Sequence, residues 1–251
     1  MLGSGTSSGV PRIGNIWGDC DPAEPRNRRT RASILVQTTQ TTILVDTGPD
    51  MRQQLLDANV GAIDAVIWTH DHADHSHGID DMRQLFLLSK APIPGYARAE
   101  TLDLLAERFG YVFEGGRGYP PTVDARVLGD DLMIGDIRVR VTDMPHGRIF
   151  SSGLRFDHAG TSIGYATDFH AMTPEMAALF AGVDVWVLDA VRRAPHPTHT
   201  HVAKAVEHVA ALKPARAILT HMDQSLDYAT LAKELPPGSE PGYDGLVVDL
   251  A

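Results

Sequence analysis

Short hydrophobic runs, many rich in β-branched residues, alternate along the chain with longer amphipathic stretches. The runs have the length of buried strands, and the amphipathic stretches repeat hydrophobic residues with the period of a helix. We predict strands at residues 33–37, 42–46, 65–69, 137–142, 162–167, 183–188, 217–220 and 245–248. We predict helices at residues 51–58, 79–89, 99–109, 174–180, 202–212 and 228–235. This mixture indicates an α/β protein in which sheets pack on each other with helices outside.

One domain, residues 1–251, is the simplest interpretation of the chain. The sequence contains no internal repeat and no low-complexity segment. Residues 110–121, which include Gly-Gly-Arg-Gly-Tyr-Pro-Pro, predict a surface loop. We do not interpret them as a linker between domains, because candidate metal ligands lie on both sides of them in the sequence.

Composition and charge narrow the class of partner. The formal net charge is −10, from 22 Lys and Arg against 32 Asp and Glu, so long nucleic acid is not an expected partner. The single cysteine, Cys20, excludes an intrachain disulfide framework and fits a reducing compartment. The sequence has neither a signal-peptide pattern nor a hydrophobic stretch approaching the roughly 18 residues of a membrane span. We therefore expect a cytoplasmic protein with no membrane partner.

A dense group of potential metal ligands follows the hydrophobic run at 65–69. His70, His72, Asp74 and His75 fall within six residues, where a buried strand would end and a loop begin. Imidazole and carboxylate groups suit Zn²⁺, and Mn²⁺ or Fe²⁺ also accept them. Four ligands this close together cannot all bind one ion in a relaxed geometry, so the spacing indicates two adjacent ions. The alternative is a histidine-rich surface loop without metal.

His146, Asp168 and His221 each stand at or just past the end of another hydrophobic run. Taken singly, such residues are more often capping aspartates or histidines with ordinary hydrogen bonds. As a set, they point to one edge of one sheet system and to a single site.

The pattern His70-x-His72-x-Asp74-His75, followed by His146, Asp168 and His221, resembles the metallo-β-lactamase superfamily over nearly the whole chain. The resemblance implies a four-layer αββα sandwich with two divalent metal ions, Zn²⁺ or Mn²⁺, at its edge. It implies that His70, His72 and His146 hold one ion, that Asp74, His75 and His221 hold the other, and that Asp168 bridges both. This complete set resembles the phosphodiesterases of the superfamily more than its lactamases. Asp46 matches an aspartate that supports the ligands in the family, although an Asp before Thr-Gly is also a common turn former.

The glycine-rich start, Gly3-Ser4-Gly5-Thr6-Ser7-Ser8-Gly9, and residues 27–33 resemble a narrower subgroup. It contains the cyclic phosphodiesterase of phosphonate breakdown, which opens 5-phosphoribosyl 1,2-cyclic phosphate; tRNA 3′-processing endonucleases share a similar start. Backbone N–H groups and hydroxyls in such a loop can approach an anionic oxygen. We therefore predict substrate contacts from Ser7, Ser8 and Arg28. The arginines at 26, 28, 29 and 31 could equally pair with surface carboxylates.

A histidine at the head of a late helix protonates the leaving oxygen in the phosphodiesterase subgroup. His199, ahead of the helix predicted at 202–212, matches it best; His201 is the second candidate and His196 a weaker one. All three could instead merely occupy the start of the helix. The resemblance thus implies His199, Asp74 and Asp168 as catalytic residues.

Two features depart from the subgroup. Its cyclic phosphodiesterase holds a structural zinc through several N-terminal cysteines and a histidine after the last metal ligand. This chain has only Cys20 and reads Met222-Asp223-Gln224 in the place of that histidine, so we predict no structural zinc. Only Met1 and Leu2 precede the glycine-rich loop, which would fit a truncated start.

The resemblance implies a hydrolase that cleaves a small phosphodiester, such as a cyclic sugar or nucleotide phosphate, through a hydroxide shared by two ions. Two alternatives stay open. One is a hydrolase of a lactone, a thioester or a β-lactam, and the other is a metal-bearing module that binds a phosphate ligand without turning it over. The charge and the lack of an inserted arm argue against tRNA, and a homodimer is the common default for a soluble protein.

Overall fold

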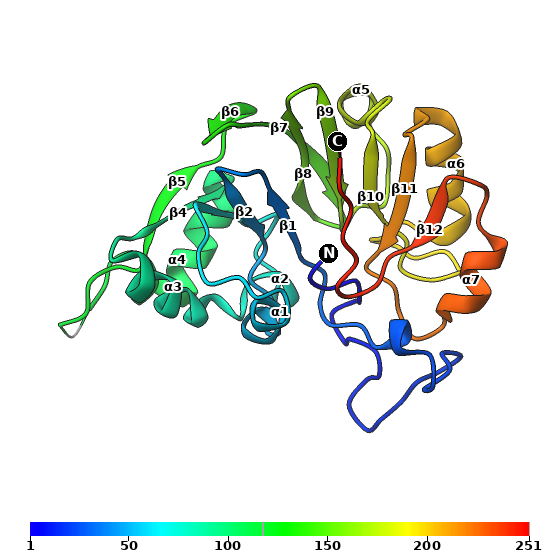
Figure 1. Ribbon diagram of the computed structural model, residues 1–251, viewed down its shortest axis with the longest axis horizontal. Helices are drawn as coiled ribbons and strands as arrows, with labels where there is room; N and C mark the ends of the chain where they lie inside the picture. The colour runs from blue at the N-terminus through cyan, green and yellow to red at the C-terminus, as the bar shows by residue number, and fades with distance from the viewer. Residues whose placement is uncertain (117, 251) are drawn as a thin grey trace.

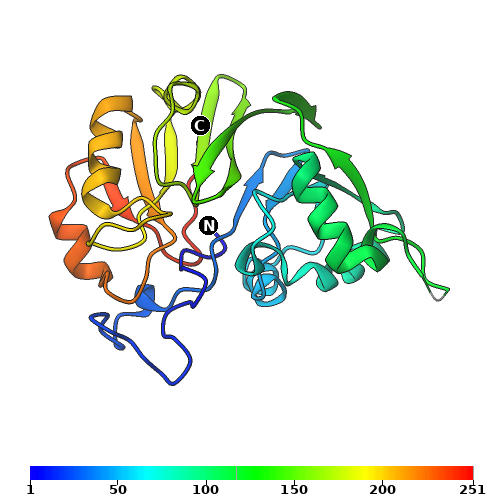
Figure 2. The same cartoon turned by 180° about the vertical axis from the view of Figure 1, so that it is seen from behind.

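Two β-sheets face each other in the computed structural model, which describes residues 1–116 and 118–250. Helices cover the outer face of each sheet, as Figure 1 and the view from behind in Figure 2 show. The layers therefore follow the order helix, sheet, sheet, helix. The predicted αββα arrangement is confirmed.

The first sheet comes from the N-terminal half of the chain. Its strands lie in the order β1 (Ile34–Gln37), β2 (Thr42–Val45), β3 (Ala65–Ile67), β4 (Ile93–Ala97) and β5 (Val123–Val127). Its outer face is covered by α1 (Met51–Asp57), α3 (Met82–Ser89) and α4 (Ala99–Phe113). The short α2 (Ala73–Ser76) and the 3-10 turn η2 (Ile79–Asp81) connect β3 to α3.

The second sheet comes from the C-terminal half. Its strands lie in the order β12 (Ser239–Pro241), β11 (Arg216–Thr220), β10 (Val185–Asp189), β9 (Thr161–Ala166), β8 (Ile149–His158), β7 (Ile137–His146) and β6 (Asp131–Ile134). Strands β9 to β12 are parallel, and β6 to β9 are antiparallel neighbours. Helices α5 (Pro174–Phe180), α6 (Val202–Leu212) and α7 (Tyr228–Glu234) cover its outer face, and η1 (Pro25–Asn27) lies in the N-terminal loop.

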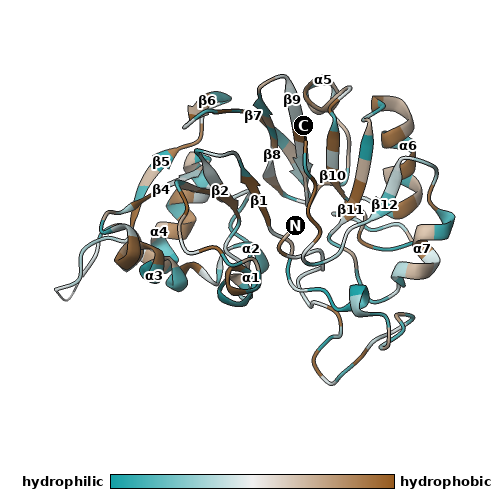
Figure 3. Ribbon diagram, in the orientation of Figure 1, coloured by the Kyte–Doolittle hydropathy of each residue, from teal (hydrophilic) through white to brown (hydrophobic). Residues whose placement is uncertain are grey.

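Strands buried on both faces explain the continuous hydrophobic runs. In β10, Val185 and Val187 face the core between the sheets, whereas Trp186 and Leu188 face the helices. Strand β2 repeats the pattern, with Leu44 pointing toward the helices of its own sheet. The hydrophobic colouring follows β1 and β10 in Figure 3.

The structure agrees with most predicted elements and corrects several. Helices α5 and α6 have the predicted bounds, whereas β4, β5, β6, β8 and β12 were not predicted. The strand predicted at 245–248 is wrong, because this segment lies along the first residue instead: the Met1 amino group donates to Leu246 O at 2.6 Å. The loop predicted at 110–121 is wrong in its first four residues, since α4 continues to Phe113 past a kink at Phe109. No helix in the described residues is long and apolar enough to cross a membrane.

Strand direction places several loop starts at one edge of the molecule. Strands β9, β10 and β11 run parallel, and β7 runs the same way because both β7 and β9 are antiparallel to β8. Their carboxyl ends therefore meet at one edge of the second sheet. The segment that follows β3 in the first sheet reaches the same place.

Candidate metal centre

All seven predicted metal ligands come together at this edge. Those of the first sheet follow β3: His70 stands just past the strand, His72 lies ahead of α2, and Asp74 and His75 lie in α2. Those of the second sheet end or follow strands, with His146 ending β7, Asp168 just after β9, and His221 directly after β11. The two sheets thus contribute to one site.

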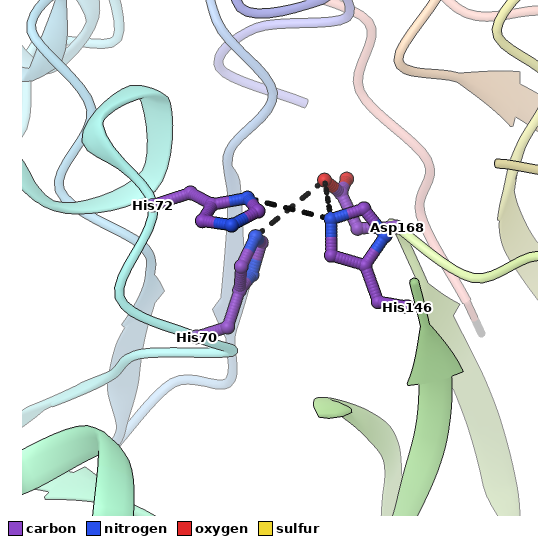
Figure 4. A group of neighbouring side chains, drawn as sticks. All are labelled: His70, His72, His146 and Asp168. Carbon is purple, nitrogen blue, oxygen red and sulfur yellow. Dashed lines mark hydrogen bonds and ion pairs between the residues drawn. The ribbon is translucent and has the colours of Figure 1, made fainter. Parts of the chain in front are cut away.

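One group consists of His70, His72, His146 and Asp168. Asp168 Oδ2 lies 3.5 Å from His70 Nε2 and 3.6 Å from His146 Nε2. His72 Nδ1 lies 3.3 Å from His146 Nε2. The side chains converge on a common point from opposite sides, as Figure 4 shows.

A second group consists of Asp74, His75, Asp168 and His221. Asp168 Oδ1 lies 3.5 Å from His75 Nε2 and 3.4 Å from His221 Nε2. Asp74 Oδ2 lies 3.4 Å from each of the same two nitrogens. Each oxygen of Asp168 therefore faces a different group, which is the arrangement that a carboxylate bridging two cations requires.

The unsatisfied atoms at the centre of the cluster fit bound cations. His70 Nε2 and His75 Nε2 are buried and have no hydrogen-bond partner among the described residues. A buried polar atom without a partner costs free energy, on the order of 1–3 kcal/mol, unless something else satisfies it. Imidazole nitrogens and carboxylate oxygens suit divalent Zn²⁺ or Mn²⁺, so the donor set fits two such ions.

Burial and neighbouring charges shift the pKa values of the cluster in opposite directions. Burial lowers the pKa of His70 well below the ordinary histidine value, and His75 lowers it further. Burial would raise the pKa of Asp168, but His221 and His75 hold it well below its usual range. Burial alone would lower the pKa of His221, but the carboxylates of Asp168, Asp74 and Asp189 together raise it to about 9. A cation that binds here must therefore displace a proton from His221.

Contacts to the ring nitrogens that face away from the cluster hold two of the ligand histidines in place. Asp46 follows β2 with a left-handed backbone (φ 65°) and is fully buried. Its carboxylate accepts hydrogen bonds from Thr69 N at 2.7 Å and from Thr69 Oγ1 at 2.9 Å, and it lies 2.7 Å from His75 Nδ1. His146 Nδ1 lies 2.9 Å from Thr198 O. These partners fix the rings so that His75 and His146 present Nε2 to the cluster.

Asp189 is a functional candidate that the sequence analysis missed. It ends β10, is fully buried, and places Oδ2 3.0 Å from His199 Nδ1. The same oxygen accepts from Thr200 N at 3.3 Å, and Oδ1 lies 3.9 Å from His221 Nδ1. Asp189 directly follows the strand predicted at 183–188, so the strand-end rule that selected Asp168 could have found it.

His199 is the histidine before α6 that the structure brings to the site. Its ring stacks on His221 with centroids 4.8 Å apart, and it is also 4.8 Å from the ring of His146. His201 directly precedes α6 and is not among the described residues that line the cleft. The ring of His196 packs against that of His199, with centroids 4.9 Å apart.

A cleft of about 320 Å³ opens over the cluster. Besides the ligands and His199, it is lined by Ser7, Gly147, Arg148, Ile149 and Thr198. Ser7 thus lies where a substrate contact was predicted, whereas the structure places Ser8 and Arg28 outside this lining. Arg148 was not singled out from the sequence, because one arginine between Gly and Ile carries no pattern.

The arginines at 26–31 are mostly engaged elsewhere. Arg26 pairs with Glu24 at 2.7 Å, and Arg31 pairs with Asp50 at 3.1 Å. Arg29 is buried and donates to the carbonyl oxygens of Asp223 and Leu226. Arg28 lies over the ring of Trp17, 5.2 Å from its centroid. Of the two alternatives for this patch, pairing with carboxylates describes Arg26 and Arg31.

The fold and this ligand set define a metallo-hydrolase architecture, and comparison with known proteins identifies the family. The model of the β-lactamase superfamily domain matches residues 41–222, a span that holds every ligand described above. The chain therefore belongs to the metallo-β-lactamase superfamily.

Several individual proteins are similar to this chain over nearly its whole length. The crystal structure of a diphosphatase from the PhnP family is similar, with a TM-score of 0.88 and 34% identity over 98% of this chain and 93% of that one. Zn²⁺-bound PqqB from Methylobacterium extorquens shares the fold, with a TM-score of 0.77 and 18% identity over 99% of this chain and 98% of that one. An octanoyltransferase of Porphyromonas gingivalis is 31% identical over 256 residues, which are 98% of this chain and 50% of that protein. The chain thus spans about half the length of this curated relative.

Proposed function

We propose that this chain is a two-metal hydrolase that cleaves a small phosphodiester. The observation that carries the proposal is Asp168, whose two oxygens face separate groups of histidine and aspartate ligands. The similarity to a PhnP-family diphosphatase over nearly the full length of both chains supports a phosphate compound as the substrate class. A cleft of about 320 Å³ falls at the small end of the range for small-molecule sites, which favours a small diester over tRNA.

The residues of the cleft divide the chemistry between them. Two divalent cations, when bound, would lower the pKa of a bound water toward about 7 and offset charge on phosphate oxygens. His70, His72 and His146 would hold one ion, Asp74, His75 and His221 the other, and Asp168 both. Asp74 and Asp168 line the cleft, where their oxygens can accept hydrogen bonds from the attacking water.

His199 supplies the proton for the leaving oxygen. Its Nδ1 faces Asp189 at 3.0 Å, so the carboxylate orients the ring and leaves Nε2 as the free nitrogen. His199 lines the cleft, so this Nε2–H can pass its proton to the departing alkoxide. General acid catalysis of this kind typically contributes 10²- to 10⁴-fold.

Hydrolysis of bis(p-nitrophenyl) phosphate tests the proposal. The protein is stripped of metal, measured, reloaded with Mn²⁺ or Zn²⁺ and measured again, with p-nitrophenyl acetate run in parallel. We expect metal-restored cleavage that favours the diester. Cleavage of the carboxylic ester alone would instead support a hydrolase of lactones, thioesters or β-lactams. Binding of phosphate ligands without any product would support a binding module.

A further inference from the structure

An arginine of α4 contacts the residue that lies between two metal ligands. Arg108 donates from Nη1 to Asp71 O at 2.6 Å and from Nη2 to Asp71 Oδ2 at 2.5 Å. Asp71 is buried and stands between His70 and His72 in the sequence. The planar guanidinium fork therefore holds both the main chain and the side chain at this position.

His72 differs from the other histidines of its group in how its ring is held. Its Nδ1 faces the cluster, 3.3 Å from His146 Nε2, and no described residue forms a hydrogen bond with its Nε2. The outward nitrogens of the other two rings do have partners: His70 Nδ1 lies 3.0 Å from Thr69 Oγ1, and His146 Nδ1 lies 2.9 Å from Thr198 O. Only Cβ and Cγ separate Nδ1 of a histidine from its Cα. The backbone at His72 therefore largely decides where the ligand atom lies.

Two side chains hydrogen-bond to this stretch of backbone. Ser76 Oγ donates to His72 O at 2.8 Å and lies 3.1 Å from Asp71 O, but Ser76 belongs to the same short segment as the ligands. Arg108 lies 37 positions further along the chain than Asp71. Among the described residues outside the segment 70–80, it alone hydrogen-bonds to the backbone of Asp71 or His72. Arg108 is thus the contact that joins this backbone to another part of the fold.

Helix α4 is itself fixed to the ligand-bearing segment. Directly after Arg108 the helix kinks at Phe109, whose ring packs edge-on against that of His77 with centroids 5.4 Å apart. Two residues later, Tyr111 Oη donates a hydrogen bond to the carboxylate of Asp80. The guanidinium of Arg108 therefore extends from a helix that is held in place beside the segment it contacts.

The ion pair between Arg108 and Asp71 should add little to the stability of the fold. The Arg108 side chain is 41% exposed, and ion pairs at exposed positions contribute little to the free energy of folding. Asp71 is outside the ligand groups, and neither residue lines the metal cleft. Loss of the pair should consequently leave the fold and the cleft lining intact while it frees the backbone at His72.

We propose that Arg108 is a positioning residue of the metal centre. By holding Asp71 it fixes the place of His72, and thereby raises the affinity for the ion that His70, His72 and His146 bind. A ligand atom that is fixed before binding gives higher affinity, because less freedom is lost when the ion arrives. The inference rests on the two-metal site of the proposed function and is independent of the substrate.

Arg108→Met tests the proposal, because it removes the guanidinium fork and keeps an unbranched side chain on α4. Affinity for Zn²⁺ is measured by competition with a chromophoric chelator and fitted as two binding steps. We expect one step to weaken 10- to 100-fold, the range typical for residues that orient a ligand, and the other to stay near its wild-type value. Arg108→Lys should recover part of the loss, since an ammonium group can donate to one of the two oxygens. Tyr111→Phe, which removes a contact of the same helix with Asp80, is the matched control and should change neither step.

Nitrogen-15 NMR of the Zn²⁺-loaded protein identifies which ion is affected. His72 is the one ligand histidine among the described residues that presents Nδ1 to the cluster, whereas the other four present Nε2. In Arg108→Met, the signal of the histidine bound through Nδ1 should disappear at a zinc concentration that still saturates the tighter site.

Unchanged affinities in Arg108→Met would overturn the proposal. So would a weakened step with the Nδ1-bound signal intact, or equal weakening of both steps together with a lower melting temperature in excess chelator, because these results describe a general structural role. A wild type that binds no ion would refute the proposed function as well. Two bound ions with the expected dependence on Arg108, but without cleavage of a diester, would keep the inference and refute the proposed hydrolysis.

Discussion

The substitution Asp46→Asn tests whether a residue that contacts a metal ligand, but does not itself bind the ion, contributes to metal binding. The residue binds no ion in the proposed site, yet its carboxylate contacts Thr69 N, Thr69 Oγ1 and His75 Nδ1 at 2.7, 2.9 and 2.7 Å. Asparagine fits the left-handed backbone at this position, because Asn and Asp tolerate positive φ. The asparagine amide, however, has only one acceptor oxygen, and its NH₂ group would face one of the hydrogen-bond donors that contact the carboxylate in the wild type. One hydrogen bond to a charged group is lost, worth about 1.5–3 kcal/mol.

The loss should appear mainly as weaker metal binding at the group that contains His75. Residues that orient a ligand typically change metal affinity 10- to 100-fold, or about 1.4–2.7 kcal/mol. The affinity of each site can be measured by competition with a chromophoric chelator, and thermal unfolding in excess chelator reports the metal-free fold. Asp131→Asn, at an exposed pair with Arg138, is the matched control and should change neither quantity. Wild-type affinity in Asp46→Asn would refute the reasoning that this carboxylate orients His75.

Three further predictions follow from the cluster. Asp168→Ala should abolish two-metal binding, measured as ions per chain by elemental analysis; two ions retained would exclude the bridging role. His199→Ala should keep both ions and lower kcat for the diester 10²- to 10⁴-fold, whereas unchanged hydrolysis would exclude it as the proton donor. Because the pKa of His221 is raised to about 9 in the metal-free protein and a ligand must be unprotonated, metal affinity should rise between pH 7 and 9 in chelator competition. The stability that protonated His221 adds to the metal-free fold should decline over the same interval, as melting curves would show.

Close backbone approach explains why some strands escaped prediction. β8 contains Gly153, where a Cβ would lie 2.7 Å from Met144 Sδ, and β4 contains Gly95, where a Cβ would lie 2.7 Å from Trp68 Cζ3. Such glycines weaken the hydrophobic pattern of a strand while packing requires them. At residues 245–248 a strand was predicted where none exists. Leu246 is buried in the core, which gives the segment a hydrophobic pattern, but the segment has no strand partner. Helix α5 was predicted correctly because Thr173 and Pro174 form a recognisable start, with Thr173 Oγ1 accepting from Met176 N.

The site was predictable where its residues follow strands and unpredictable where only tertiary packing matters. The ligand set came from a motif together with residues at strand ends, and the structure brings all of it together. Asp189 carries the same strand-end signal, but this signal does not reveal that the aspartate contacts His199. Arg148 enters the cleft through the register of β7 and β8, which no single stretch of sequence reveals.

The ligands of the cluster are divided between the two sheets: four follow β3, and three end or follow strands of the second sheet. Neither sheet alone can assemble the site, so it exists only after the sheets have docked along their shared core. Bound ions would therefore hold the two sheets together, stabilising the docked state by about 2.7 kcal/mol at a free metal concentration of 100 Kd. Metal release through separation of the layers would require breaking the interior itself. We therefore expect ions to exchange through the open mouth, beside exposed His72, rather than by parting of the sheets.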